Sequence, residues 1–255
     1  MEKKSSSVKL RSAAGQQEIA APRKRLSVEE REKQILAGAI QFFSEHGLDG
    51  QMRVLARDMG ITHALFYHYF PTKQALIERV YEELFEGRWK PEWQAMLDDP
   101  ALDPEQKIVR FYCDYADTVL TRDFVRIFIF SGLSDHYIPD RFFALLRERL
   151  FPRLVRETRK FRGSSSRAKP SVRELELLMG LHGGIFYTGV RRFIYGQAIN
   201  TAATDPNGEA FIIDRVRSYL LSASAILDAK PAASATPRKR VLAKPKSRTT
   251  KTKES

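Results

Sequence analysis

Apolar residues recur every three or four positions along most of the chain, which is the spacing of one face of an α-helix. The first such segment opens with a capping box, in which Ser27 and Glu30 satisfy each other's backbone donors. It runs to about His46, where Gly47 ends it. Its apolar face comprises Ile35, Leu36, Ala39, Phe42 and Phe43. Because strand-like alternation is scarce, the pattern predicts an all-α protein.

The stretch from Gln51 to Lys73 predicts two short helices, near 51–59 and 62–69. Gly60 lies in the turn between them, where a positive φ costs little for glycine alone. The apolar residues have the spacing that lets two crossing helices share a small core: Leu55, Met59, Ile61, Phe66 and Tyr69. This pattern is typical of a helix-turn-helix, whose second helix enters the major groove of DNA.

Helical periodicity continues beyond this unit. Thr72 can cap a fourth helix over about 73–88, and a proline-punctuated linker region follows it. A larger domain then contains five predicted helices, near 104–119, 124–133, 140–161, 171–196 and 209–228. A second capping box at Ser171–Glu174 opens the fourth of these, after a flexible loop at 163–170. The predicted domains are therefore 27–89, with the helix-turn-helix and linking helix, and 90–228.

The net charge of +12 lies in the two ends of the chain. Residues 1–26 sum to +5 and residues 229–255 to +8, which leaves about −1 for everything between them. Both ends lack apolar periodicity, so we expect a disordered basic arm at 1–26 and a disordered basic tail at 229–255. Such tails are suited to binding a polyanion, of which nucleic acid is the first candidate and an anionic membrane the second.

Several functional classes lack support in the sequence. The single cysteine, Cys113, rules out an internal disulfide and fits a cytoplasmic protein. No apolar run is long enough to span a membrane, and we find none of the common nucleotide-binding, hydrolase or metalloprotease motifs. We therefore expect no enzyme activity, no catalytic residue, no cofactor, no metal site and no membrane partner.

The predicted recognition helix presents a defined set of side chains to DNA. Thr62 and His63 can donate or accept hydrogen bonds at base edges, and Ala64 and Leu65 can contact a thymine methyl group. Tyr67 and His68 suit phosphates or bases near the edge of the groove.

Lys73 begins the fourth helix, where its charge opposes the helix dipole by about 0.3–1 kcal/mol. This position makes sense if a DNA phosphate binds there, held by the helix N–H groups and the ammonium together. The alternative is a solvated surface lysine. Arg53 and Arg57, on the first helix of the motif, are secondary candidates for contacts to the DNA backbone.

Residues 27–80 resemble the DNA-binding domain of the TetR/AcrR repressors, and FYHYFPTKQAL at 66–76 is the most specific part of the resemblance. The resemblance implies a homodimer, a palindromic operator and an all-α second domain that binds a small ligand. It also implies that Tyr67 and Lys73 contact phosphate and that 62–65 face the groove. The matching residues are Arg31, Ile35, Leu36, Ala39, Phe42, Phe43, Gly47, Leu55, Ala56, Gly60, Ile61, Thr62, Phe66, Tyr67, Phe70, Lys73 and Leu76.

The sequence departs from the pattern of that family in three places. Gln51 stands where a threonine commonly caps the second helix, and Ala64-Leu65 replaces a common Gly-Thr. His63 replaces a frequent lysine. The operator sequences of that family therefore cannot be assigned to this chain.

The resemblance places the dimer interface on the last two helices, about 171–196 and 209–228, and the ligand pocket among the helices before them. We expect a small, mostly apolar ligand, signalled to DNA through the fourth helix. The pocket candidates are Phe111, Tyr115, Phe128, Tyr137, Phe142, His182, Phe186 and Tyr187. Each can equally be an ordinary core residue. An alternative function is a ligand-independent architectural DNA-binding protein that uses its basic tails.

Overall fold

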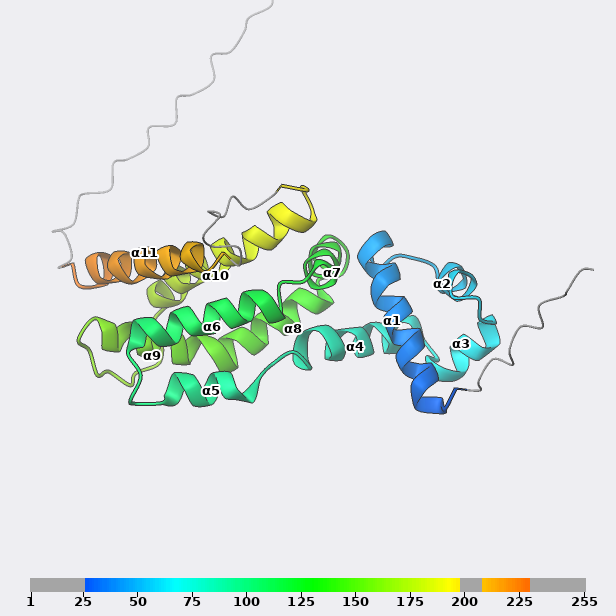
Figure 1. The fold of residues 1–255 in the computed structure, drawn as a ribbon, viewed down its shortest axis with the longest axis horizontal. Coiled ribbons are helices and arrows are strands. Elements are labelled where there is room, and N and C mark those ends of the chain that lie inside the picture. Colours follow the sequence, from blue (N-terminus) through cyan, green and yellow to red (C-terminus); the bar gives the residue numbers. More distant parts are fainter. Residues whose placement is uncertain (1–25, 198–207, 230–255) are drawn as a thin grey trace, which may run out of the picture.

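The computed structural model describes residues 26–197 and 208–229, and every regular element in these ranges is helical (Figure 1). The predicted all-α fold is confirmed for this part of the chain. The predicted disorder of the two basic ends lies outside the described residues, apart from Leu26 and Ala229 at their borders. None of the described helices is both long and apolar enough to cross a membrane.

The N-terminal unit has the three helices that the apolar pattern predicts. They are α1 (Val28–His46), α2 (Met52–Asp58) and α3 (His63–Tyr69). The capping box before α1 forms: the Glu30 N–H donates to Ser27 Oγ (3.1 Å), and the Ser27 N–H donates to Glu30 Oε2 (2.7 Å). Gly47 ends α1 with a positive φ of 77°. Gly60, with a φ of 64°, lies in the turn between α2 and α3.

The next segment differs from its prediction in two ways. α4 (Lys73–Tyr81) begins at the predicted Thr72 cap but continues as a π-turn, η1 (Glu82–Glu86). The region predicted to be a linker contains a helix, α5 (Pro91–Asp98), which buries Trp93 and Leu97. The linker prediction was wrong because proline interrupts a helix only in its interior. At the first position its missing N–H costs nothing, and Pro91 occupies that position.

The second domain contains α6 (Pro104–Thr118) and α7 (Arg122–Leu133), followed by one long helical segment. This segment consists of α8 (Tyr137–Leu145), a π-turn η2 (Leu146–Leu150) and α9 (Phe151–Phe161). It corresponds to the helix predicted at 140–161. Pro152 explains the π-turn, because it cannot donate the hydrogen bond that an α-helix would give to the carbonyl of Glu148.

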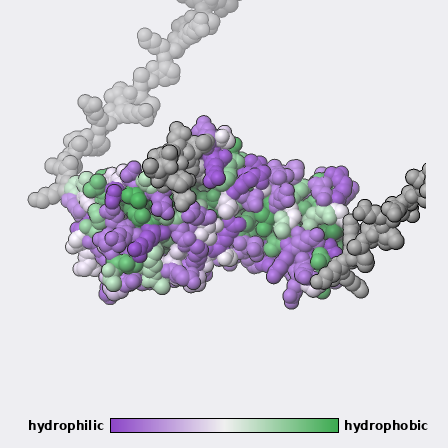
Figure 2. Space-filling view, viewed as in Figure 1, coloured by the Kyte–Doolittle hydropathy of each residue, from purple (hydrophilic) through white to green (hydrophobic). Residues whose placement is uncertain are grey.

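The last two helices are α10 (Val172–Phe193) and α11 (Glu209–Leu227). α10 opens with the predicted capping box of Ser171 and Glu174 and ends three residues before the predicted Gly196. α10 packs against α11, and α6 and α9 lie beside them, so this end of the molecule is a helical bundle (Figure 1). Hydrophilic residues cover most of the face seen in Figure 2, with small hydrophobic patches between them.

The two domains meet where α1 ends against α7. The Arg122 guanidinium donates to Ser44 Oγ (3.0 Å), and Arg126 donates to the carbonyl of Ser44. A second junction joins η1 to α8, where Arg141 pairs with Glu86 (3.1 Å). The N-terminal unit is therefore attached to the bundle through α1 as well as through α4.

Candidate nucleic-acid interface and aromatic core

α3 lies at one end of the elongated molecule and presents one face to solvent (Figure 1). Phe66 is fully buried and holds the helix on the domain core, whereas His63, Ala64 and His68 are exposed. Tyr67 is 37% exposed, and its ring packs edge-on against that of His63 one turn earlier (4.5 Å between centroids). His63 and Tyr67 thus form a continuous aromatic surface on the side of α3 that would face a groove.

Two of the predicted base-reading residues also have structural roles. Thr62 caps α3, because its Oγ1 accepts the N–H of Leu65 (3.2 Å). The Thr62 hydroxyl hydrogen remains available as a donor toward DNA. Leu65 is half-buried, so only part of its side chain can reach a thymine methyl. Gln51 makes no side-chain capping bond to α2, in contrast to the threonine expected there in the resembling family.

The start of α4 has the electrostatic features of a phosphate contact. Thr72 Oγ1 accepts the N–H of Ala75 (3.0 Å), and Lys73 follows as the first helical residue. No acidic residue lies in the first turn of α2, α3 or α4, whereas α1, α6 and α10 each have one or two. The three helix starts nearest the candidate surface therefore keep their positive dipole ends uncompensated.

Arg53 and Arg57 are both exposed on α2. The Arg57 guanidinium approaches Asp58 (3.4 Å), but the side chains of this pair are 75% and 46% exposed. Such an exposed pair contributes little to stability, so Arg57 can exchange Asp58 for a DNA phosphate at small cost.

The eight pocket candidates divide into two buried aromatic clusters and two separate residues. Phe111, Tyr115 and His182 lie together between α6 and α10, and Phe128, Phe142 and Phe186 pack together from α7, α8 and α10. Tyr137 lies apart, where its hydroxyl accepts a hydrogen bond from Arg141 (2.6 Å). Tyr187 is 50% exposed on α10, so half of its side chain is in contact with solvent.

Polar atoms interrupt the first of these clusters. His182 is 3% exposed, and its Nε2 lies 3.4 Å from the Tyr115 hydroxyl. Burial lowers the pKa of His182 to about 4, so the ring is neutral at neutral pH. Its Nδ1 and the hydroxyl of Tyr112 find no hydrogen-bond partner among the described residues. Unpaired buried polar atoms are uncommon, and two of them lie in this cluster.

Arg126 is a junction residue that the sequence did not single out. Besides the carbonyl of Ser44 in α1, it donates to the carbonyl of Phe193 at the end of α10 (3.4 Å). In the sequence it appears only as an interruption of an apolar run. Within the described residues, no group of three His, Cys, Asp or Glu side chains is placed to hold a metal ion.

Comparison with known proteins agrees with this geometry. Residues 35–80 match the family described as bacterial regulatory proteins, tetR family. No curated protein sequence matches the chain significantly.

Solved structures share the fold along most of the chain. A TetR-like transcriptional regulator from Rhodococcus sp. RHA1 is 20% identical, with a TM-score of 0.57, and the match covers 79% of this chain and 99% of that one. A TetR-family regulator from Streptomyces coelicolor is 18% identical, with a TM-score of 0.53 over 80% of this chain and 85% of that one. One from Pseudomonas syringae pv. tomato str. DC3000 is 15% identical, with a TM-score of 0.52 over 76% and 96%.

Proposed function

This chain carries the N-terminal domain of the tetR family on the fold of TetR-family transcriptional regulators, and we propose that it is a sequence-specific, ligand-responsive repressor. It binds a palindromic operator as a homodimer. The observation that carries the proposal is the exposed face of α3, with His63, Ala64 and Tyr67 held outward by the buried Phe66.

The surface of the last two helices supports the dimer. On α10, the space beside Gly180 and Gly183 is open in the single chain, and Tyr187 on the same face is exposed. On α11, Leu221 is 65% exposed. One recognition helix reads only a few base pairs, so two copies are needed to reach successive half-sites about one helical turn apart.

The His182 cluster supports a ligand that is mostly apolar with one polar group. The aromatic walls provide apolar contact, and the unpaired His182 Nδ1 and Tyr112 hydroxyl offer hydrogen bonds. A ligand releases DNA only if it binds the two states of the protein with different affinities. The α1–α7 and η1–α8 junctions are the routes by which such a difference would reach α3.

A binding-site selection with the full chain, followed by mobility-shift titrations, tests the proposal. We expect preference for one palindrome over random DNA by at least about a thousandfold. His63→Ala should reduce that preference, whereas Lys73→Ala should weaken binding to all sequences and lower the salt slope by about one. Arg110→Ala, an exposed cation on α6, is the matched control and should behave as wild type.

A lack of preference for any palindrome would favour the alternative function, a ligand-independent architectural DNA-binding protein. Equal affinity for the selected palindrome and for random DNA, with no change in His63→Ala, would mean that binding depends on charge alone. Screening for compounds that release the operator then identifies the ligand, with His182→Phe as the variant expected to lose the response.

A further inference from the structure

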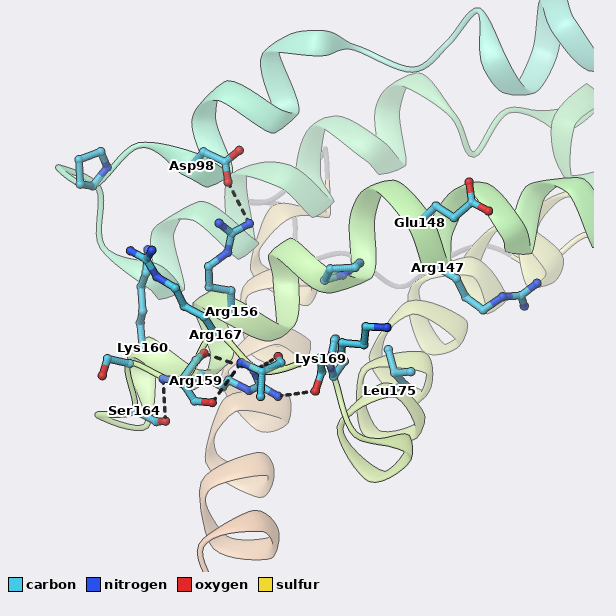
Figure 3. A pocket seen from close by; sticks show the side chains of 16 residues that line it. Asp98, Arg147, Glu148, Arg156, Arg159, Lys160, Ser164, Arg167, Lys169 and Leu175 are labelled. Carbon is cyan, nitrogen blue, oxygen red and sulfur yellow. Dashed lines mark hydrogen bonds and ion pairs between the residues drawn. The ribbon is translucent and has the colours of Figure 1, made fainter.

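A large basic cleft lies at the end of the bundle farthest from α3 (Figures 1 and 3). It has a volume of about 1140 Å³ and opens between η2–α9, the end of α5 and the loop that joins α9 to α10. Six cationic and two acidic side chains line it. The cationic ones are Arg147, Arg156, Arg159, Lys160, Arg167 and Lys169.

This concentration of positive charge contrasts with the rest of the molecule. The chain between its two basic ends sums to about −1, yet the cleft gathers six cations around one hollow. A concave wall with charges of one sign focuses the electric field and attracts counter-ions. Since DNA bound at α3 would lie at the other end of the molecule, the operator does not account for this charge.

Existing ion pairs leave much of the charge uncompensated. Asp98 is shared by two arginines, Arg153 (3.2 Å) and Arg156 (3.1 Å). Glu157 likewise forms ion pairs with both Lys160 (2.8 Å) and the buried Lys107 (3.0 Å). Each shared carboxylate therefore leaves one net positive charge beside the cleft.

Three further cations have no such partner. Arg147, Arg167 and Lys169 form no ion pair within the described part of the chain, and all three are exposed at the cleft. Figure 3 shows Arg147 at one side of the hollow and Arg167 toward the other, with Lys169 between them. Charges arranged in this way are available to an anion with more than one charged group.

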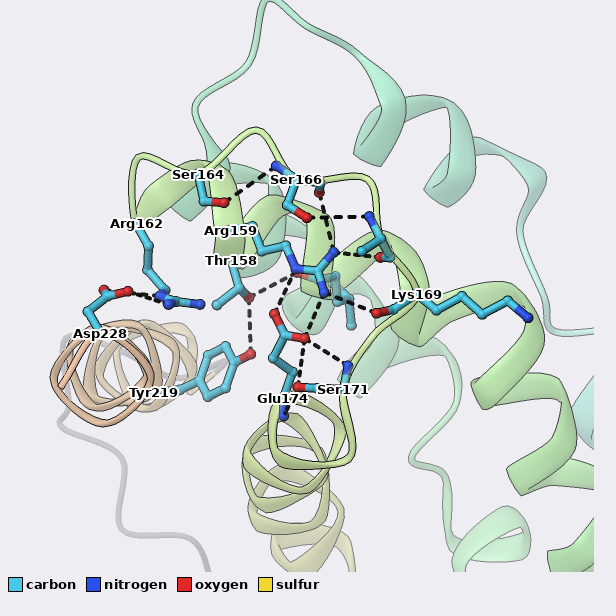
Figure 4. A network of polar contacts seen from close by, with 12 residues as sticks. Thr158, Arg159, Arg162, Ser164, Ser166, Lys169, Ser171, Glu174, Tyr219 and Asp228 are labelled. Carbon is cyan, nitrogen blue, oxygen red and sulfur yellow. Dashed lines mark hydrogen bonds and ion pairs between the residues drawn. The ribbon is translucent and has the colours of Figure 1, made fainter. Parts of the chain in front are cut away.

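The wall that carries Arg167 and Lys169 is fixed in place by a buried charge network (Figure 4). Arg159, only 8% exposed, binds both oxygens of Glu174 at 2.7 Å and also donates to three carbonyls of the loop. Those carbonyls belong to Ser166 (3.3 Å), Ala168 (2.6 Å) and Lys169 (3.3 Å). The loop that we predicted to be flexible is thus fastened to α9 and α10, which preorganises the cleft.

We propose that this cleft binds a small polyanionic molecule, one with two or more phosphate or carboxylate groups. Its volume exceeds that of most drug-sized ligand pockets, about 300–1,000 Å³, so a molecule of nucleotide size fits. Arg147, Arg167 and Lys169 bind the anionic groups, and Ser165 and its neighbouring serines supply hydroxyl donors. Pro152, Pro170 and Leu175 contact the uncharged part of the ligand.

The test uses the full chain with ATP and inorganic pyrophosphate as probes, at a salt concentration near 150 mM. Calorimetry measures affinity, and hydrogen exchange by mass spectrometry locates the site. We expect both probes to bind and to slow exchange in peptides covering 145–175. Arg147→Gln/Lys169→Gln should weaken binding at least about tenfold, because it removes two charge-assisted contacts. Lys33→Gln/Arg110→Gln, which removes the same charge at exposed positions on α1 and α6, should stay within about twofold of wild type.

Several results would overturn the proposal. Absence of binding, equal weakening in both double variants, or protection confined to 1–25 and 230–255 would each show that the cleft is not the site. Protection of 145–175 by a short oligonucleotide, but by neither probe, would assign the surface to nucleic acid instead. The inference does not depend on repressor activity, because operator affinity is measured separately by mobility shift. The hydrogen-exchange experiment uses the wild-type protein, so its result does not depend on whether any variant folds.

Discussion

At the scale of single residues, helical periodicity predicts which side chains face outward but not which ones enclose a space. The exposed set on α3 follows from the 3.6-residue repeat once Phe66 and Ile61 are assigned to the core. The sequence identifies the pocket candidates only by residue type, and six of the eight lie in two clusters whose rings contact one another. Cavity shape depends on contacts between distant helices, so the repeat does not specify it.

His182 gives this protein a specific dependence on pH. Its folded-state pKa of about 4 lies below the ordinary value of 6.5, so the unfolded state binds the proton more readily. Its contribution to stability is complete above pH 6.5 and is lost as the pH falls toward 4. At pH 5 this loss amounts to about 2 kcal/mol.

His182→Gln keeps a hydrogen-bonding group but does not titrate, so its free energy of unfolding should fall less between pH 7 and pH 5. Urea unfolding at a series of pH values measures the difference. His68→Gln, at an exposed position on α3, serves as control and should keep the wild-type slope. Identical slopes in wild type and His182→Gln would contradict the assignment.

At the scale of elements, both capping boxes form as predicted because each requires only two residue types three positions apart. The helix α5 is not predicted when the prolines at 91, 100 and 104 are treated as interruptions, although Pro91 is at a position that favours a helix start. Of the two π-turns, η2 precedes Pro152, whereas η1 has no comparable sequence signature. The α1–α7 junction was missed because Arg126 in an apolar run gives no indication of which helix end it will bind.

The Arg159–Glu174 pair joins three elements, and its energetics can be measured. Arg159 is the main cause that lowers the pKa of Glu174 to about 2, with the carboxylate and guanidinium both largely buried. Arg159→Met should therefore destabilise the fold by about 3–5 kcal/mol, because it leaves a buried carboxylate unpaired.

Adding Glu174→Met should recover part of that loss, since the unpaired charge is then removed. Denaturant unfolding of both single variants and the double variant yields the coupling energy. Arg79→Met removes exposed ion pairs with Glu82 and Glu32 and should cost less than about 1 kcal/mol. Additive effects in the Arg159–Glu174 cycle would show that the pair does not act as a unit.

At the scale of the whole molecule, the proposed dimer depends on the outer face of α10 and α11. Leu221→Glu should shift the protein toward a monomer, because a charge would be buried in the interface. Analytical ultracentrifugation across a concentration series measures the shift. Leu133→Glu changes a leucine that is 80% exposed on α7 and should leave the association unchanged. A dimer of equal strength in Leu221→Glu would place the interface elsewhere.

We expect the basic tail at 229–255 to set a second property of the whole molecule, the salt dependence of its DNA binding. Its net charge of +8 should contribute affinity for DNA of any sequence through counter-ion release. A chain ending at Asp228 should bind random DNA more weakly, with a shallower salt dependence, while keeping its preference for the operator. Unchanged affinity and slope in mobility-shift titrations would assign the tail to solubility alone.

The π-turn η1 has a consequence for how much change in chain length this architecture tolerates. It holds one residue more than an α-helix of the same rise, and the Gly87 N–H closes it on the carbonyl of Glu82 (2.6 Å). In a regular helix, losing one residue would turn everything beyond it by about 100°. Here, deletion of the exposed Glu83 would restore an ordinary turn without rotating either flank. The segment between Lys73 and the bundle can therefore lose a residue while α3 and the second domain keep their mutual orientation.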